Sequence, residues 1–147
     1  MYKTILVTLD GSALAEQALP HAEQVAHGAG AELILLQVIS LSNIGQVTLD
    51  TEVPIDFPSV EQRLKAEASE YLESKAAPLA AKGIKTRTMV ARGGAATAIM
   101  DVLEREKVDL IVLTSHGRSG LSKWVHGSTA AKILDKSTCP VLLIRSK

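Results

Sequence analysis

Short apolar runs alternate with longer amphipathic segments along the whole chain. Mostly apolar runs of this length are typical of buried strands, and we predict strands at 4–9, 32–38, 84–91, 108–113 and 141–144. The segments between them repeat apolar side chains at helical spacing, which predicts helices at 12–28, 59–82, 95–107 and 130–134. Strands that alternate with helices indicate an α/β domain with a parallel sheet, helices on both faces and right-handed crossovers.

Particular residues mark where these helices begin and end. Ser12 has the position of an N-cap for the first helix, and Pro20 within it predicts a kink or a local break. Ser59 has the position of an N-cap for the second helix, in capping-box spacing with Gln62. Pro78, near the far end of that helix, indicates a bend or an early stop.

Residues 40–58 follow neither period. Gly45, Pro54 and Pro58 interrupt this stretch, so we predict a long excursion, with or without a short helix, over one edge of the pocket. Long connections of this kind serve either as functional lids or simply as variable surface loops, and the sequence leaves both interpretations open.

The segment 114–129 joins the end of a predicted strand to the start of a predicted helix, and it is the most informative part of the chain. Gly117 allows a close backbone approach that a side chain would block. Gly127, Ser128 and Thr129 then open the helix, where unpaired N–H groups and two hydroxyls suit an anion, most often phosphate. Several groups have to converge, because one helix end contributes only about 0.3–1 kcal/mol per charge. The alternative is that these residues only cap local structure.

Asp10 lies at the carboxyl end of the first predicted strand. Ligands of parallel α/β sheets bind beyond the carboxyl ends of the strands, so this carboxylate is placed to bind a base, a ribose or a metal ion. It could equally shape the turn that it forms with Gly11 and Ser12 and help to cap the first helix. His116 offers a similar choice between a phosphate or ribose oxygen and local hydrogen bonds in its own turn.

The spacing of the glycines resembles a known family. Gly117, nine further residues and then Gly127-Ser128 are similar to the latter part of the G-x-x-G-x9-G-[S/T] motif of nucleotide-binding universal stress proteins. Thr114 occupies the place of the first glycine of that motif. Residues 5–12 resemble the opening strand and turn of the family, and residues 137–144 resemble its closing strand. The resemblance therefore covers essentially the whole chain.

The resemblance implies a fold, a ligand and an assembly. It implies a single doubly wound, five-stranded parallel sheet of order 3-2-1-4-5, adenine-nucleotide α-hydrolase-like, with a crevice between strands 1 and 4. It implies ATP or another adenine nucleotide with Mg²⁺, and phosphate oxygens would be the main ligands of the metal. It also implies a homodimer through the edge strand at 141–144.

The candidate nucleotide-binding residues are Thr8, Asp10, Val38, Leu113, Thr114, His116, Gly117, Gly127, Ser128 and Thr129. By resemblance, Asp10 and Val38 would hold the base and ribose, and Thr8 stands where many members have proline. The glycines and hydroxyls of the later segment would hold the phosphates, with His116 between the two groups.

Composition and charge argue against several other classes. The chain has 147 residues, enough for one domain (1–147) with its own core, and its 16 basic and 16 acidic side chains balance. A neutral chain with 3% aromatic residues is not expected to bind nucleic acid or an anionic membrane. No apolar run has the length of a membrane span, so we expect a cytoplasmic protein. Cys139 is the only cysteine, which excludes an intrachain disulfide.

The sequence shows groups for binding but none of the familiar catalytic motifs. It has no Walker-type phosphate loop, no dinucleotide-binding glycine motif and no nucleophile elbow. We therefore expect a regulatory, stress-response module that binds ATP with slow or no hydrolysis. Two alternatives stay open: an ATP-hydrolysing enzyme of the same fold, and a dimeric stress protein that binds other proteins but no nucleotide.

Overall fold

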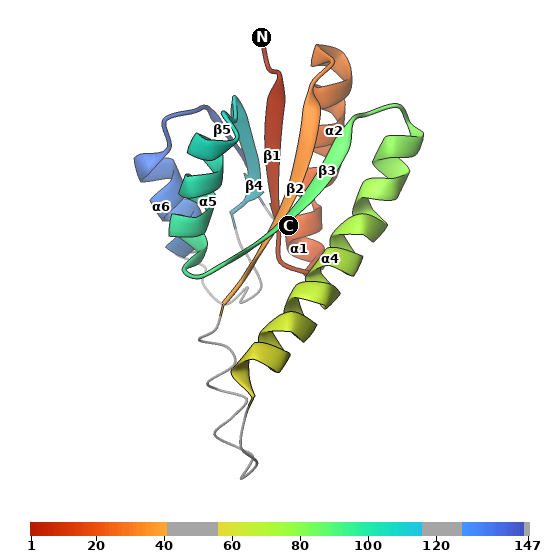
Figure 1. The fold of residues 1–147 in the computed structure, drawn as a ribbon. Coiled ribbons are helices and arrows are strands. Elements are labelled where there is room, and N and C mark those ends of the chain that lie inside the picture. Colours follow the sequence, from red (N-terminus) through yellow and green to blue (C-terminus); the bar gives the residue numbers. More distant parts are fainter. Residues whose placement is uncertain (41–55, 116–127, 146–147) are drawn as a thin grey trace.

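The computed structural model describes residues 1–40, 56–115 and 128–145 (Figure 1). Its centre is a five-stranded sheet of order β3-β2-β1-β4-β5 in which every pairing is parallel, and this confirms the order implied by resemblance. The strands are β1 (Thr4–Leu9), β2 (Glu32–Ile39), β3 (Thr86–Arg92), β4 (Leu110–Thr114) and β5 (Val141–Ile144). β1 and β5 have the predicted bounds, and the other three differ from prediction by two residues at most.

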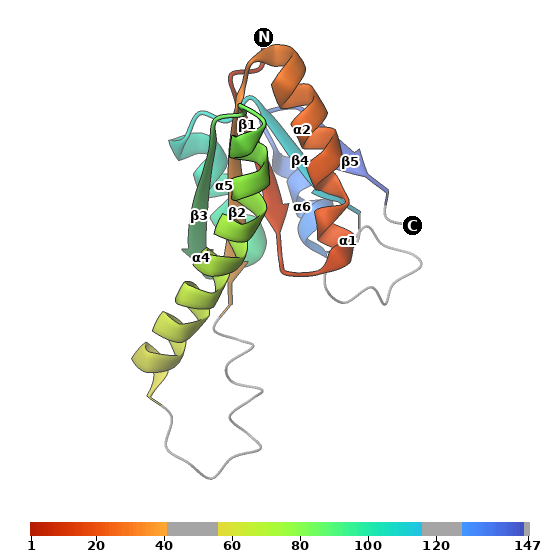
Figure 2. The same cartoon turned by 90° about the vertical axis from the view of Figure 1, so that its right-hand side faces the viewer.

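Helices cover both faces of the sheet, as predicted (Figures 1 and 2). The helices on one face are α1 (Ala13–Glu16), α2 (Ala18–Ala29) and α4 (Phe57–Ala81). Those on the other face are α5 (Ala95–Arg105) and α6 (Ser128–Lys136). Within the described ranges, no helix is both long and apolar enough to cross a membrane.

The side chains of β2 show why both layers of helices are needed. Leu33 and Leu35 are buried beneath α2 and α4, whereas Ile34 and Leu36 are buried beneath α5 and α6. A strand that is apolar on both faces is shielded from water only between two layers of helices. The position of β2 at the interior of the sheet therefore follows from its continuous apolar sequence.

The first helical segment is interrupted, as Pro20 predicts. Ser12 caps α1, because its Oγ accepts the N–H of Ala15 at 3.1 Å. α1 ends at Glu16, and α2 begins two residues later. Proline has no N–H for the carbonyl four residues earlier, here that of Glu16, and its ring crowds that carbonyl. The break therefore lies just ahead of Pro20, and Gly30, with a φ of +65°, ends α2.

α4 begins two residues earlier than predicted and ends at Ala81, one residue before the predicted end. The prediction of Ser59 as its N-cap is wrong, because the cap is Asp56 and Ser59 lies in the first turn, where its Oγ donates to Asp56 Oδ2 at 2.6 Å. Pro58 allows this earlier start, since the first turn of a helix does not use its N–H groups. An early stop at Pro78 is also wrong: the helix continues for three more residues, with Leu79 buried against the sheet.

Asp109 joins the amino end of β1 to the start of β4. Its Oδ2 accepts the backbone N–H groups of Lys3 and Thr4, both at 2.8 Å. Its own N–H donates to the carbonyl of Thr4 at 2.8 Å. The backbone hydrogen bonds from Lys3 and then Thr4 hold the pKa of the Asp109 carboxyl below its ordinary value. The ionised carboxylate therefore stabilises the pairing of these two central strands.

We predict that Asp109→Asn destabilises the protein in a pH-dependent way. When the pKa of a carboxyl group is lower in the folded chain than in the unfolded chain, the group stabilises the fold fully at pH values above its unfolded pKa of about 3.9. That stabilisation is lost as the pH falls through the lower pKa of the folded chain. At pH 7 the variant should lose about 0.5–1 kcal/mol of unfolding free energy in urea, because the amide oxygen still accepts but no longer carries charge and the site is screened by water. The loss should shrink as the pH falls below about 4. An equal loss at neutral and acidic pH would contradict this account.

Candidate functional site

The carboxyl ends of β1, β2 and β4 meet at one edge of the sheet, the lower edge in Figure 1. We call this the carboxyl edge. Leu9 of β1 pairs with Gln37 of β2, so the next residue, Asp10, lies level with Val38. The register of β1 with β4, continued in the same way, places Asp10 level with Ser115. Residues that are far apart in the sequence therefore meet where α/β sheets bind their ligands.

Three of the candidate residues share one face of the sheet. Val38 and Leu113 pack in the core beneath α5 and α6. Leu6 packs in the same core, and Thr8, two residues further along β1, points to the same side because side chains alternate along a strand. The same alternation turns Thr114 to the other face, where the residue is 8% exposed and its backbone pairs with β5. Thr114 therefore belongs to the strand rather than to the loop that follows it.

Asp10 shapes the turn at the end of β1. Its Oδ1 accepts both the backbone N–H of Ser12 at 2.9 Å and the Ser12 hydroxyl at 2.5 Å. Gly11 between them has a φ of +88°, a conformation that glycine adopts without strain. The turn-forming role predicted for Asp10 is thus confirmed. Because both hydrogen bonds go to Oδ1, Oδ2 takes no part in the turn.

The amino end of α6 lies at the same edge. β5 runs parallel to β4, so the helix between them has to start at the carboxyl edge and return toward the amino edge (Figure 1). Ala130 and Ile133 are buried and fix α6 against the same face as Val38. Its first residue, Ser128, is exposed, and Thr129 is partly exposed. An anion at this edge would therefore meet the positive end of the helix and two residues that carry hydroxyl groups.

The structure thus brings the described candidates to one edge of the sheet, but they do not all lie on the same face of the sheet. Thr8, Asp10, Val38 and Leu113 lie there with the start of α6, whereas Thr114 faces the other layer. His116, Gly117 and Gly127 lie outside the described residues. Of the excursion predicted at 40–58, residues 41–55 lie outside them too, whereas Phe57 and Pro58 belong to α4 and not to a loop.

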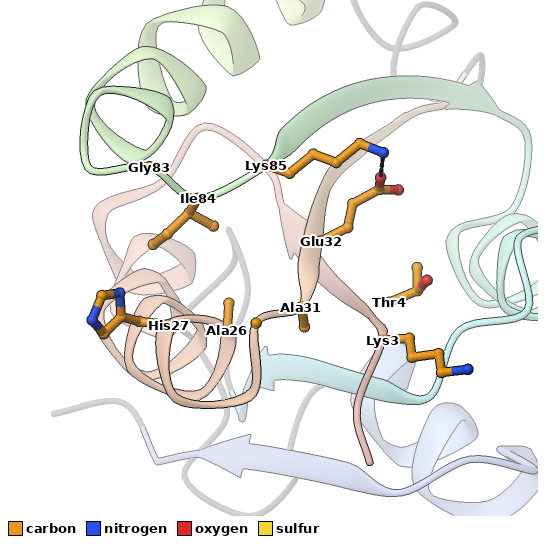
Figure 3. A pocket seen from close by; sticks show the side chains of 10 residues that line it. Lys3, Thr4, Ala26, His27, Ala31, Glu32, Gly83, Ile84 and Lys85 are labelled. Carbon is orange, nitrogen blue, oxygen red and sulfur yellow. Dashed lines mark ion pairs between the residues drawn. The ribbon is translucent and has the colours of Figure 1, made fainter.

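A cavity of about 380 Å³ lies at the opposite, amino edge of the sheet (Figure 3). It is lined by the amino ends of β1 and β2, by the carboxyl end of α2 and by the residues after α4. Helix carboxyl ends carry partial negative charge and disfavour an anion. Lys85 in its wall is already paired with Glu32, with 3.2 Å from Nζ to Oε2. Lys3 and His27 also line this cavity, but its lining residues include no helix amino end, so the carboxyl edge suits phosphate better.

The sequence patterns did not reveal a polar cluster beside the Asp10 turn. The Tyr71 hydroxyl of α4 donates to Glu16 Oε2 of α1 at 2.7 Å. Lys75 Nζ lies 2.9 Å from the other carboxylate oxygen of Glu16 and 5.7 Å from the centre of the Tyr71 ring. Tyr71 has the helical spacing of a core residue, so periodicity indicates its burial but not the partner of its hydroxyl.

Comparison with known proteins agrees with this geometry. Residues 1–145 match the universal stress protein family. The chain is 33% identical to universal stress protein YxiE of Bacillus subtilis, over 99% of this chain and 100% of that one. It is 31% identical to protein MJ0577 of Methanocaldococcus jannaschii, whose structure superposes with a TM-score of 0.87 over 100% of this chain and 98% of that one.

Two more distant structures share the fold. One is a universal stress protein in complex with cAMP, 21% identical with a TM-score of 0.68 over 99% of this chain and 98% of that one. The other is a universal stress family protein of Arabidopsis thaliana with AMP bound, 16% identical with a TM-score of 0.63 over 99% of this chain and 92% of that one. Some proteins of this fold thus bind adenine nucleotides.

We predict that Ser12→Ala lowers the free energy of unfolding by about 1–2 kcal/mol, because the variant loses the N-cap of α1 and a bond to Asp10. Urea denaturation followed by circular dichroism measures the loss. Ser69→Ala, at an exposed position of α4, is the matched control and should leave stability unchanged or slightly higher. Equal stability of the Ser12 variant and wild type would show that the cap contributes little.

Proposed function

Because the chain belongs to the universal stress protein family, we propose that it binds an adenine nucleotide at the carboxyl edge, with ATP and Mg²⁺ as the leading candidates. It would act as a single domain over residues 1–147, a cytoplasmic stress-response module with slow or no hydrolysis. The observation that carries this proposal is the meeting of the Asp10 turn with the amino end of α6 at one edge of the sheet.

The two ends of the nucleotide would bind different elements. Asp10 Oδ2 and the backbone of Val38 would contact the ribose and base, beside Thr8 and Leu113. Ser128 and Thr129, with the free N–H groups of the first turn of α6, would contact the phosphates. By resemblance, Gly117 and Gly127 would let the backbone approach the phosphates, and His116 would lie between the two ends.

Mg²⁺ would depend on the phosphates for most of its ligands. Among the described residues, no group of three or more His, Cys, Asp or Glu side chains could hold a metal ion. Mg²⁺ commonly binds through phosphate oxygens and water with few protein ligands. We propose slow or absent turnover because Asp10, the carboxylate that we assign to the site, would lie at the base and ribose end, away from the phosphates.

The first experiment is to purify the protein natively, denature it and identify the released small molecules by mass spectrometry. Stoichiometric adenine nucleotide would support the proposal and identify the ligand. If nothing is released, titration with Mg-ATP should change the fluorescence of Trp124, the only tryptophan of the chain. If neither experiment detects a nucleotide, the proposal fails in favour of a dimeric interaction module.

Two variants separate the two ends of the proposed site. Asp10→Asn keeps the Oδ1 acceptor of the turn but replaces Oδ2 with an amide nitrogen. It should therefore weaken the binding of adenosine, AMP and ATP by the same factor, about tenfold. Ser128→Ala should weaken the binding of ATP about tenfold but leave the binding of adenosine unchanged. Calorimetric titration gives the ratios, with Ser69→Ala as control. If Ser128→Ala weakens adenosine and ATP equally, α6 does not bind the phosphates.

We also propose that two copies of the chain associate through β5. This strand is at the edge of the sheet, pairs with β4 on one side and carries four apolar residues that are all only partly buried. An apolar edge strand that stays unpaired promotes uncontrolled association, so a second copy of the same strand is a suitable cover.

We predict a dimer at micromolar concentration and a monomer for Leu143→Pro. The carbonyls of Pro140 and Ile144 accept bonds from β4, so the parallel ladder turns the N–H of Leu143 outward. Proline there removes a donor from the outer edge without removing one from the β4 ladder. Light scattering gives the mass, and circular dichroism checks that the variant is folded. A monomeric wild type would refute the dimer.

A further inference from the structure

Gln37 occupies a corner of the carboxyl edge. It pairs with Leu9, the last residue of β1, whereas β2 continues for two more residues, to Ile39. Asp10 follows Leu9 in the sequence, and Val38 follows Gln37. Gln37 therefore lies beside the two residues to which we assign the base and ribose end of the nucleotide.

The side chain of Gln37 lies on the face of the sheet that α1, α2 and α4 cover. Leu33 and Leu35 of the same strand are buried on that face, and side chains alternate along a strand. Leu9 and Val90, the neighbours of Gln37 on β1 and β3, pack in the same core. A polar amide thus interrupts an otherwise apolar row of β2 side chains.

The amide oxygen of Gln37 has no hydrogen-bond partner. Among the residues that the structure describes, Gln37 Oε1 is the one buried side-chain nitrogen or oxygen without a partner. A buried polar atom in this state destabilises a fold. Gln37 as a whole is only partly buried, and no hydrogen bond holds Oε1 in place. The amide can therefore turn toward the carboxyl edge without breaking a bond to this oxygen.

A glutamine amide is complementary to one edge of adenine. Its oxygen can accept from the exocyclic amino group N6 while its nitrogen donates to the ring nitrogen N7. Hypoxanthine, the base of inosine, has an oxygen in place of the amino group, so the same edge presents two acceptors. An amide placed there would set its own oxygen against one of them. A glutamine at this position therefore favours adenine over hypoxanthine.

We propose that Gln37 recognises the base of the bound nucleotide: its amide turns to the ligand, accepts from the adenine amino group and donates to N7. This inference rests on the proposed function. The simpler interpretation is that an ordered water donates to Oε1 and that Gln37 takes no part in binding. The two interpretations differ in what removal of the amide does to the preference among bases.

The test is Gln37→Met, which keeps the length and flexibility of the side chain and removes both hydrogen-bonding groups. Calorimetric titration measures the preference of each protein for adenosine over inosine and over 7-deazaadenosine, which lacks N7. Both preferences should be about tenfold smaller in the variant than in wild type. The reason is that adenosine loses two hydrogen bonds, whereas the other two nucleosides lose less.

Two controls accompany this variant. Gln62→Met makes the same exchange at an exposed position of α4, and it should leave both preferences unchanged. Thermal denaturation of Gln37→Met should give a melting temperature no lower than that of wild type, because the exchange removes a buried acceptor that has no partner. A change of preference in such a variant is not a consequence of unfolding.

The outcomes separate the inference from the proposed function. If wild type binds no adenine compound, the proposed function fails and the inference fails with it. If wild type binds adenosine and Gln37→Met keeps both preferences, the proposed function stands and the inference is overturned. An equal loss of affinity for all three nucleosides would also overturn the inference, because that loss would not depend on the edge of the base.

Discussion

Burial of the central strands on both faces is the constraint on which the rest of this structure depends. Ile5, Leu6 and Val7 of β1 are all 0% exposed, so β1 needs a strand on each side and a helix layer above and below. Helical connections make every pairing parallel, and all the strands then end at one edge. The Asp10 turn, the end of β2 and the start of α6 meet there because the core requires this arrangement.

The two edges of the sheet consequently differ in their chemistry. The carboxyl edge carries the amino ends of helices, whose first N–H groups have no acceptor within the helix, and it suits a phosphate. The amino edge carries helix carboxyl ends, and its cavity is lined by charges that are partly paired with each other. Asp10 links structure and proposed function at the first edge, since one of its oxygens builds the turn and the other takes no part in it.

The hydrophobic pattern was sufficient to predict the strands and the two helix layers, and Pro20 predicted the break in the first helix, because these features depend on local period and local sterics. The strand order came from family resemblance, since period does not encode which strands are neighbours. The Ser59 cap was wrong because Asp56 and Pro58 together allow an earlier start. The bond between Tyr71 and Glu16 joins residues 55 positions apart, and no local pattern reports such a contact.

Titration of the isotope-labelled protein with Mg-ATP, followed by amide NMR, tests the central claim most directly, because it locates the ligand without assuming which residues bind it. The account predicts that shifts concentrate at Gly11, at the end of β2 and in the first turn of α6. Amides of the amino edge, such as those of Gly30 and Gly83, should stay unchanged. Shifts confined to the amino edge, or none at all, would contradict the assignment of the site.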